Sequence, residues 1–426
     1  MEDKNKKIAI LSTFDNWDKA YSLVSVVENQ LLALVDNGYK PILFVHDNFS
    51  DDEKVPKGVE VRKVIPRFHL IDYALMQPVE DGFEDQVKKV QEVLEQELKE
   101  VDVTITHDFI FQGWFLPYNV GMRKAQPNLK CKWLHWNHSA PSSRPEKLEY
   151  PHDCRYKTMP NSKLIYMNHY DSLRLAEAYG AGLDDVRVVM NPLDVRSFFN
   201  FHPLVDKLID KYKLLEADII DVYPVSSTRF GGKQVEKVIK VMSKLKKEGK
   251  NVRFICANAH ANADNEKREI QKMIQYGIEC GLTRNEIIFT SLEGEEYEQG
   301  VPHEVVKDLF LLSNIFVFPT ISENCPLILL EAAATRNLLV LNDSFPALRD
   351  FMGKDALYFK FGSLQESVDY KDEEQYFADI AKIIIGQLNT NKPLNVFTKI
   401  KNKFNYNWIF KNQLEPILYE DWTNNR

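Results

Sequence analysis

The sequence lacks the features that mark secreted, disulfide-linked or membrane-spanning chains. It has only five cysteines in 426 residues, they are scattered, and none forms a C-x-x-C pair: Cys131, Cys154, Cys256, Cys280 and Cys325. This pattern argues against a disulfide framework or a zinc site and favours a reducing compartment. No apolar run approaches the roughly 18 residues of a transmembrane helix. The first residues also lack the apolar core of a signal peptide. We therefore expect a cytoplasmic globular protein.

An excess of positive charge is also missing. The formal net charge is −8, which provides no general electrostatic footprint for nucleic acid. Basic clusters do occur within 240–253 and 399–411. Each can be interpreted as a solvated helix face or as a local patch for an acceptor. The length suggests two domains, or three.

Two phosphate-binding motifs are absent. No segment matches the Walker pattern G-x-x-x-x-G-K-[ST], and no D-x-D triplet occurs in the chain. A metal-bridged diphosphate site of the D-x-D type is therefore not supported. We expect neither a metal nor a cofactor, so positive charge for a phosphate would come from side chains and helix termini.

Short apolar strands alternate with amphipathic helices along most of the chain, which predicts an α/β fold with parallel sheets and right-handed crossovers. The pattern runs through residues 1–195, weakens over 196–216 and resumes over 217–401. The interpretation is two doubly wound, Rossmann-like domains that face each other across a cleft. Residues 196–216 would be the linker region, and a helix over 402–426 would pack back on the first domain. Strands are predicted at 7–12, 41–46, 101–106, 130–134, 163–167, 186–190, 219–226, 252–257, 287–290, 315–318, 338–342 and 356–359.

In the second domain, the strand at 219–226 is followed by Arg229, Gly231, Gly232 and Lys233, just before a helix. Arginine can bind phosphate bidentately, lysine adds a point charge, and glycines allow close approach of the backbone. The alternative is an ordinary strand-to-helix turn with surface charges. A diphosphate site is favoured because a second polar loop is predicted on the same sheet edge.

That second loop follows the strand at 315–318 and carries Glu323, while Glu331 lies in the apolar helix beyond Pro326. Open α/β sheets bind ligands at the carboxyl ends of their strands, and two carboxylates suit a ligand rich in hydroxyls. The spacing of eight is weak evidence, because Glu84 and Glu92 repeat it in a charged helix. The position between a buried strand and an apolar helix is the stronger argument.

In the first domain, His107 and Asp108 follow one strand, and His135 and His138 lie at the end of another. A single histidine is usually structural, but three histidines and an aspartate at neighbouring strand ends favour a ligand site. They could be metal ligands, although no H-x-x-x-H helix or nearby cysteine supports this. Hydrogen bonds to a sugar or phosphate are the favoured role.

Together these residues resemble the retaining glycosyltransferases with two Rossmann-like domains, the GT-B fold, of the large family-4 type. Arg229 and Lys233 match the pair that grips the donor diphosphate in that family. Glu323 and Glu331 match its E-x7-E signature, in which the first glutamate lies near the donor sugar and the second binds the ribose hydroxyls.

The resemblance extends to further positions. Residues 191–194 match the family's N-x-x-D segment at the end of the first domain. His138, followed by Ser139, matches a strand-terminal histidine that orients the sugar or its phosphate, and His135 is the rival. The resemblance implies that Glu323 and His138 are catalytic. The backbone amides of the turn into the helix would share the phosphate charge, which adds these donor-binding residues: Asn324, Cys325, Pro326 and Leu327.

Two departures from the family pattern are visible. The loop after the first strand, 12–17, has no glycine where the family often has a glycine-rich loop. Its residues Phe14, Asp15 and Asn16 are candidates for an acceptor contact or the cleft, as are His107, Asp108 and His135. The second departure is the missing glycine after Glu331, where the chain has Thr335, Arg336 and Asn337.

The resemblance implies transfer of a sugar from a nucleoside diphosphate sugar, expected to be a UDP-sugar, with retention at the anomeric carbon. The acceptor would be a glycan, a lipid or another hydroxyl compound. One alternative is a bacteriophage type of glycosyltransferase that modifies hydroxymethylated DNA bases. Another is a sugar-nucleotide epimerase, which shares the two-domain fold and needs no acceptor.

Overall fold

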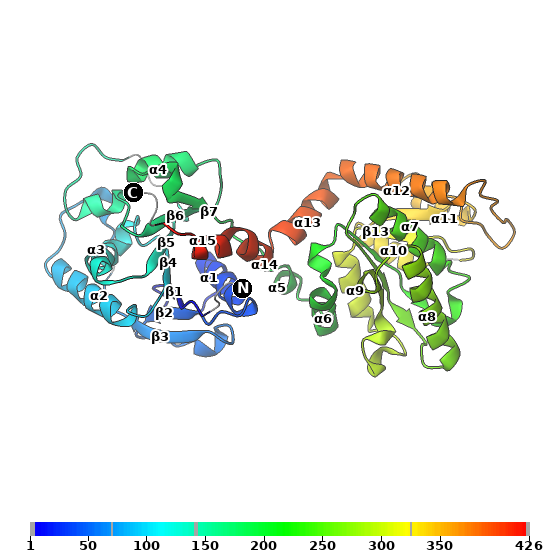
Figure 1. Ribbon diagram of the computed structural model, residues 1–426, viewed down its shortest axis with the longest axis horizontal. Coiled ribbons are helices and arrows are strands. Elements are labelled where there is room, and N and C mark those ends of the chain that lie inside the picture. Colours follow the sequence, from blue (N-terminus) through cyan, green and yellow to red (C-terminus); the bar gives the residue numbers. More distant parts are fainter. Residues whose placement is uncertain (1–4, 70, 140–143, 324–325, 423–426) are drawn as a thin grey trace. The chain divides into compact units, whose positions relative to one another are not determined.

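A computed structural model describes residues 5–69, 71–139, 144–323 and 326–422 (Figure 1). The chain forms two compact units. The first contains Met1–Asp194 and Phe404–Arg426, and the second contains Val195–Lys403. The chain thus crosses between the units twice, and the two crossing segments meet in the first unit where the Leu193 amide donates to the Phe404 carbonyl, 2.8 Å away. The arrangement of one unit relative to the other stays a prediction.

The first unit is built on a sheet whose seven described strands are all parallel and lie in the order β3-β2-β1-β4-β5-β6-β7. The strands are β1 (Ile8–Leu11), β2 (Ile42–His46), β3 (Glu60–Ile65), β4 (Val103–His107), β5 (Lys132–Trp136), β6 (Ser162–Tyr166) and β7 (Val186–Val188). The helices are α1 (Ser22–Asp36), α2 (Phe83–Glu97), α3 (Leu116–Ala125), α4 (Ser172–Tyr179), α14 (Tyr406–Ile409) and α15 (Glu415–Tyr419).

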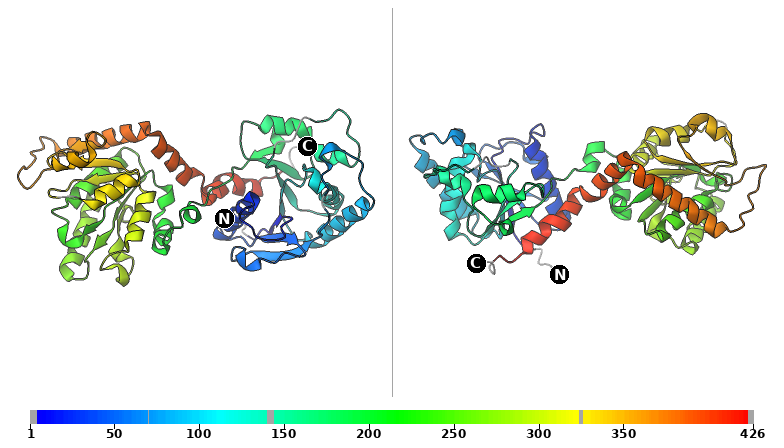
Figure 2. Two further views of the ribbon diagram at one scale, coloured as in Figure 1. Left: turned by 180° about the vertical axis from the view of Figure 1, so that it is seen from behind. Right: turned by 90° about the horizontal axis from the view of Figure 1, so that it is seen from above.

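Helices cover both faces of this sheet. Side chains of α1, α14 and α15 form one apolar cluster with one face, and side chains of α2, α3 and α4 form another cluster with the opposite face. The C-terminal segment lies along α1 (Figure 2). It is held there by the Tyr406 hydroxyl, which donates to Asp36 at 2.8 Å, and by an ion pair between Arg187 and Glu420.

The second unit has a sheet of six described parallel strands in the order β12-β10-β8-β13-β14-β15. The strands are β8 (Ile219–Val222), β10 (Val252–Cys256), β12 (Ile287–Phe289), β13 (Ile315–Phe318), β14 (Leu338–Asn342) and β15 (Leu357–Phe359), with β9 (Val225–Ser226) and β11 (Asn258–Ala259) as a separate pair. The helices are α5 (Val195–Phe199), α6 (Pro203–Tyr212), α7 (Val235–Lys247), α8 (Asp264–Glu279), α9 (His303–Leu312), α10 (Leu327–Ala334), α11 (Ala347–Met352), α12 (Glu373–Thr390) and α13 (Lys392–Lys403).

The predicted α/β class with two parallel, doubly wound sheets is confirmed. In each sheet the strand order reverses at one place, between β1 and β4 in the first unit and between β8 and β13 in the second. Loops that leave neighbouring strands at such a switch point diverge to opposite faces and leave a crevice at the carboxyl edge. The topology therefore marks one ligand-binding position in each unit.

Two regions differ from their sequence-based expectation. Residues 196–216, expected as a linker region, are mostly helical and belong to the second unit, because Leu204, Leu208 and Ile209 of α6 are buried in its core. Proline at the first position of α6 and apolar residues at helical spacing are the signals for this helix. The edge strand β3 was not predicted, because it has no continuous apolar run; one of its six residues is buried, three are half-buried and two are exposed.

A buried carboxyl group joins the two strands at the switch point of the second unit. Asp221 of β8 is fully buried and accepts a hydrogen bond of 3.2 Å from the Val317 amide of β13. Burial raises the pKa of Asp221 well above its ordinary range. The carboxyl group there takes the place of a backbone acceptor where β8 and β13 are paired at only one register position.

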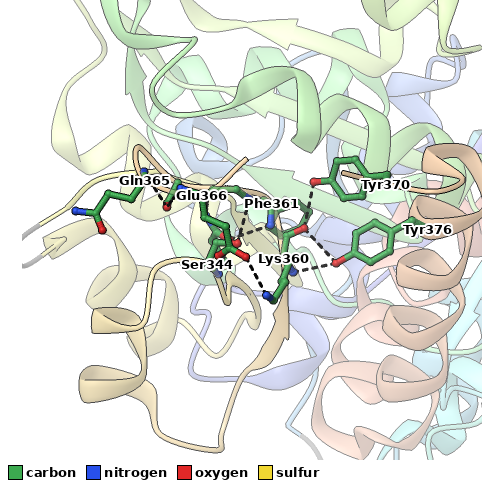
Figure 3. Close-up of polar contacts among 10 residues, drawn as sticks. Ser344, Lys360, Phe361, Gln365, Glu366, Tyr370 and Tyr376 are labelled. Atoms are coloured by element: carbon green, nitrogen blue, oxygen red, sulfur yellow. Dashed lines mark hydrogen bonds and ion pairs between the residues drawn. The ribbon is translucent and has the colours of Figure 1, made fainter. Parts of the chain in front are cut away.

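Asn342, at the end of β14, ties together the loops that follow three strands. Its amide nitrogen donates to the carbonyls of Thr320 and Gly362 at 3.0 and 2.6 Å, and its amide oxygen accepts from the amides of Ser344 and Phe361 at 3.0 and 2.9 Å. Figure 3 shows Ser344 and Phe361 beside Lys360, whose carbonyl accepts from the hydroxyls of two tyrosines. One side chain thus fixes the carboxyl edge between β13 and β15.

We expect Asn342→Ala to lower the free energy of unfolding by about 3 kcal/mol, because it leaves several buried backbone groups without partners. Denaturant unfolding followed by circular dichroism would measure the loss. The control is Asn389→Ala, at an exposed asparagine of the same unit, which should change stability by less than about 0.5 kcal/mol. Equal stability of the two variants would contradict the role given to Asn342.

Candidate functional site

In the second unit, the loops at the switch point bring a lysine and a glutamate together. Lys233 lies just before α7, and Glu323 lies in the turn after β13. The Lys233 ammonium forms an ion pair with the Glu323 carboxylate and lies 3.4 Å from the Thr320 hydroxyl. Two residues 90 positions apart in the sequence thus meet in the crevice that the strand order predicts.

Lys233 is largely buried, and this shapes its charge. Its side chain is only 9% exposed, and burial, with the nearby Arg229 charge, lowers the pKa of Lys233 to about 8. The Glu323 carboxylate is the group that balances a buried ammonium here. Arg229 itself lies in a single helical turn before Lys233 and is exposed. The crevice therefore holds one compensated and one exposed cation.

The two glycines between these cations have no steric reason to be glycine. Neither Gly231 nor Gly232 has a positive φ. A Cβ added to Gly231 would meet no atom within 4 Å, and one added to Gly232 would only touch the Arg229 carbonyl at 3.9 Å. The fold does not require glycine at either position. The exposed backbone of this loop is therefore suited to close approach by a ligand.

Glu331 lies in the middle of α10, and its side chain is about one-third exposed. Its carboxylate is 3.0 Å from Nε2 of His303, at the start of α9. Pro326 is buried at the start of α10, and Leu327 is exposed. The predicted donor residues Asn324 and Cys325 lie outside the described residues. The structure brings Lys233 to Glu323 and places Glu331 beside a histidine that the sequence analysis missed.

A second polar cluster of this unit was also missed. Asn258, which is fully buried after β10, donates to the hydroxyls of Ser227 and Ser291 at 2.9 and 2.8 Å. It therefore joins the loops after β8, β10 and β12. The only sequence signal is an asparagine directly after a strand, and such residues are common in turns.

In the first unit, parallel register brings the predicted histidines to one level. His107 of β4 pairs with Trp136 of β5, so the residues after each strand emerge side by side. Nδ1 of His107 is 2.8 Å from Nε2 of His138. Asp108 accepts a hydrogen bond of 2.7 Å from the His138 amide. His107, Asp108 and His138 thus form one cluster at the carboxyl edge.

Burial controls the charges in this cluster. Desolvation lowers the pKa of His138 to about 4 and that of His107 well below its usual range, and it raises the pKa of Asp108 to about 6. Both imidazoles are therefore neutral at pH 7. Asp108 also has a left-handed φ of 61°, a conformation that aspartate and asparagine tolerate better than most residues.

The rival histidine, His135, lies elsewhere. It points to the opposite face of β5 from Trp136, is fully buried, and is stacked on Trp133. Its Nδ1 is 2.8 Å from the Thr106 hydroxyl, while its Nε2 has no partner within the described part of the chain. Burial lowers the pKa of His135 to about 3. This position suits a core residue and not a ligand contact.

The loop after β1 contributes in part to the same edge. Phe14 is buried against Trp17. Asp15 forms an ion pair of 3.2 Å with Arg67, and Asn16 is exposed. Tyr21 follows at the start of α1. Its pKa is raised first by burial and then by the Asp108 charge.

Metal-ligand clusters and membrane-spanning helices are both absent from the residues that the structure describes. Across the described ranges, no three His, Cys, Asp or Glu side chains gather as metal ligands, and independence from metal stays a prediction. None of the helices in the described segments is long and apolar enough to span a membrane.

Comparisons with known proteins find structural likeness only. No protein-family model matches the sequence, and no curated protein matches it. Among solved structures, a glycosyltransferase from Rickettsia africae ESF-5 has 14% identity and a TM-score of 0.36, with 98% of this chain and 100% of that chain covered. HepE from Anabaena in complex with UDP and glucose has 14% identity and a TM-score of 0.31, with 96% and 95% covered.

A third solved structure is described as trehalose-6-phosphate from E. coli bound with UDP-2-fluoro glucose. It has 10% identity and a TM-score of 0.38, with 98% of this chain and 100% of that chain covered. At such identities and TM-scores, none of these likenesses assigns an activity to this chain.

We expect His135 to make the protein less stable in acid. Between its folded pKa of about 3 and the ordinary value of about 6.5, only the unfolded state binds the proton, so stability falls as the pH drops below 6.5. The slope for one such residue is about 1.4 kcal/mol per pH unit. His135→Asn should flatten the curve of unfolding free energy between pH 6.5 and 4.5 by about this slope. Parallel curves for the two proteins would contradict the assignment.

Proposed function

We propose that the protein is a retaining glycosyltransferase that transfers a sugar from a nucleoside diphosphate sugar, a UDP-sugar by expectation, to a hydroxyl acceptor. The observation that carries the proposal is the switch-point crevice of the second unit, where Lys233, Arg229 and Glu323 gather. Cations there suit the diphosphate, and the carboxylates suit hydroxyl groups.

The cations would stabilise the leaving group. When the bond from the anomeric carbon to the diphosphate breaks, negative charge grows on the departing oxygen, and prepositioned positive charge lowers that barrier most in a desolvated site. Lys233 has the burial this requires, and Arg229 is exposed and can turn toward a phosphate. The bare backbone at Gly231 and Gly232 leaves room for the diphosphate to approach.

The pairing of Lys233 with Glu323 has a consequence for donor binding. In the absence of donor, the carboxylate holds the ammonium where a phosphate oxygen would lie. Donor binding then exchanges one anion for another, and it frees Glu323 to accept hydrogen bonds from sugar hydroxyls. The exchange keeps the buried lysine charged throughout, since a buried cation without a counter-ion is costly.

Glu331 would hold the ribose. Its carboxylate is partly exposed on α10, and a carboxylate can accept hydrogen bonds from two neighbouring hydroxyls. In the first unit, the neutral His138 would contact the transferred sugar or the acceptor.

Product analysis by mass spectrometry, with glycan, lipid and hydroxymethylated DNA acceptors in parallel, identifies the acceptor. It also separates transfer from epimerisation, which would change the donor without any acceptor.

We expect Lys233→Ala to weaken UDP binding by about 10- to 100-fold, because the loss of a charge-assisted hydrogen bond to a phosphate costs about 1.5–3 kcal/mol. Isothermal titration calorimetry would measure the affinity. The control is Lys382→Ala, which removes the same charge from an exposed position of α12 and should bind UDP as the unmodified protein does. Wild-type affinity in Lys233→Ala would contradict the donor site.

We expect Glu323→Gln to separate binding from turnover. Removal of the carboxylate abolishes the anion that competes for Lys233, so UDP should bind as tightly as before or more tightly. Transfer should fall by at least about tenfold, because the sugar loses a charged hydrogen-bond acceptor. Titration of UDP and initial rates with the full donor would show both effects. Weaker UDP binding with an unchanged rate of transfer would overturn the proposal that a donor phosphate replaces Glu323 as the partner of Lys233.

A further inference from the structure

A chain of hydrogen bonds extends inward from His138 to a buried glutamine of the first unit. Nε2 of His138 is 2.8 Å from Nδ1 of His107, and Nε2 of His107 is 3.1 Å from Oε1 of Gln30. The three residues come from α1, β4 and the loop after β5. Gln30 is 6% exposed and His107 is 2% exposed, so water has little access to the inner bond.

The chemistry of the Gln30 amide sets the direction of these hydrogen bonds, that is, which atom of each pair carries the hydrogen. An amide oxygen can only accept a hydrogen bond, so Nε2 of His107 must carry a hydrogen. A neutral imidazole has one ring hydrogen, and burial keeps His107 neutral because it lowers its pKa. Nδ1 of His107 is therefore a bare acceptor, and the hydrogen of the next bond must come from Nε2 of His138.

The same argument determines the outer nitrogen of His138. Burial lowers the pKa of His138 to about 4, so this ring also has a single hydrogen at neutral pH. That hydrogen lies on Nε2, and Nδ1 is left with a lone pair. Among the described residues, Nδ1 of His138 has no hydrogen-bond partner, and the side chain is partly exposed.

We propose that Gln30 is a positioning residue which, through His107, holds His138 in the tautomer with a bare Nδ1, so that His138 recognises a ligand hydroxyl and not a phosphate or carboxylate. The hydroxyl role rests on the proposed function, since the ligand hydroxyl would belong to the transferred sugar or its acceptor. The tautomer itself rests only on the geometry of the three side chains.

Asp108 makes the arrangement more definite. Its carboxylate accepts from the His138 amide at 2.7 Å and from the side-chain amide of Gln112 at 3.0 Å, which fixes the loop that carries the ring. It contacts the backbone of His138 and not the imidazole. The carboxylate therefore sets the position of His138, while the state of its ring is left to His107 and Gln30.

The charge state has a consequence for selectivity. A neutral nitrogen with a lone pair attracts an O–H group but offers nothing to an anion, which needs a donor or a positive charge. The diphosphate would therefore be bound by Lys233 and Arg229 in the second unit. His138, in the first unit, would bind a neutral, hydroxyl-bearing ligand group.

The test measures the tautomer directly. With ¹⁵N-labelled histidine at pH 8, the nitrogen chemical shifts distinguish a protonated from a bare ring nitrogen. We expect the unmodified protein to show His107 and His138 both protonated at Nε2. Gln30→Met, which has a similar shape but only a weakly accepting sulfur in place of the amide oxygen, should turn both rings into mixtures of tautomers. Gln30→Glu, which keeps an acceptor oxygen, should restore the single tautomer.

Kinetics provide a second readout. We expect Gln30→Met to lower kcat about three- to tenfold, the value of one hydrogen bond, with UDP affinity unchanged. Gln30→Glu should recover the rate at pH 8. Gln96→Met, at an exposed glutamine of α2, is the matched control and should change neither the tautomers nor the rate.

The outcomes separate this proposal from the proposed function. A His138 ring protonated at Nδ1 in the unmodified protein would overturn the proposed chain of hydrogen bonds from Gln30 through His107 to His138. Unchanged tautomers and an unchanged kcat in Gln30→Met would overturn it as well. The first measurement needs no variant, so poor folding of Gln30→Met cannot hide the answer. If no donor is bound or consumed by the unmodified protein, the proposed function and the hydroxyl role both fail, while the nitrogen shifts still report whether this chain of hydrogen bonds exists.

Discussion

Parallel strand pairing is the constraint on which the rest of this structure depends. It places the carboxyl ends of all strands of a sheet on one edge, and the reversal of strand order opens that edge at a single place. In the second unit this place lies between β8 and β13, where Lys233 meets Glu323. In the first unit it lies between β1 and β4, beside the histidine cluster. The candidate side chains are brought together by register and not by nearness in the sequence.

Burial then decides which of these groups are charged. The same desolvation that lowers the pKa of Lys233 to about 8 keeps His138 neutral and raises the pKa of Asp108 to about 6. The lysine keeps its charge because a carboxylate lies beside it, whereas the Asp108 carboxylate bonds to the backbone of His138 and not to either imidazole. The two units therefore present different chemistry, cations and carboxylates in one and neutral acceptors in the other.

Much of this could be predicted from the sequence. Apolar strands that alternate with amphipathic helices predicted the fold class. Polar residues in the loops at the carboxyl ends of strands predicted Lys233, Glu323, His107 and His138, because these signals are local. The helix α6 was not predicted, because the Phe and Lys residues around it obscured the helical spacing of its apolar residues.

The remaining site features depend on contacts between distant segments. Nothing local distinguishes His135, which faces the core, from His138, because both lie close to one strand end. The register of β5 decides between them. Gln30 did leave a trace, as a polar residue within the buried apolar stripe of α1, but its partner could be named only from the fold. His303 left no signal, since its contact with Glu331 joins the start of α9 to the middle of a separate helix, α10.

The two polar pairs, one in each unit, follow one physical rule: a buried polar group needs a partner until a ligand replaces that partner. Glu323 forms an ion pair with Lys233 because a buried ammonium without a counter-ion is costly. The exchange of Glu323 for a phosphate would leave the number of buried charge pairs unchanged. His138 follows the rule differently. Its inner nitrogen is satisfied by His107 and ultimately by Gln30, while the side chain is partly exposed, so that its outer nitrogen can remain hydrated. A hydroxyl that displaces water from Nδ1 would then exchange one hydrogen bond for a similar one. Binding at each pair would thus be an exchange of equivalent partners, and selectivity would come from the kind of partner each group accepts.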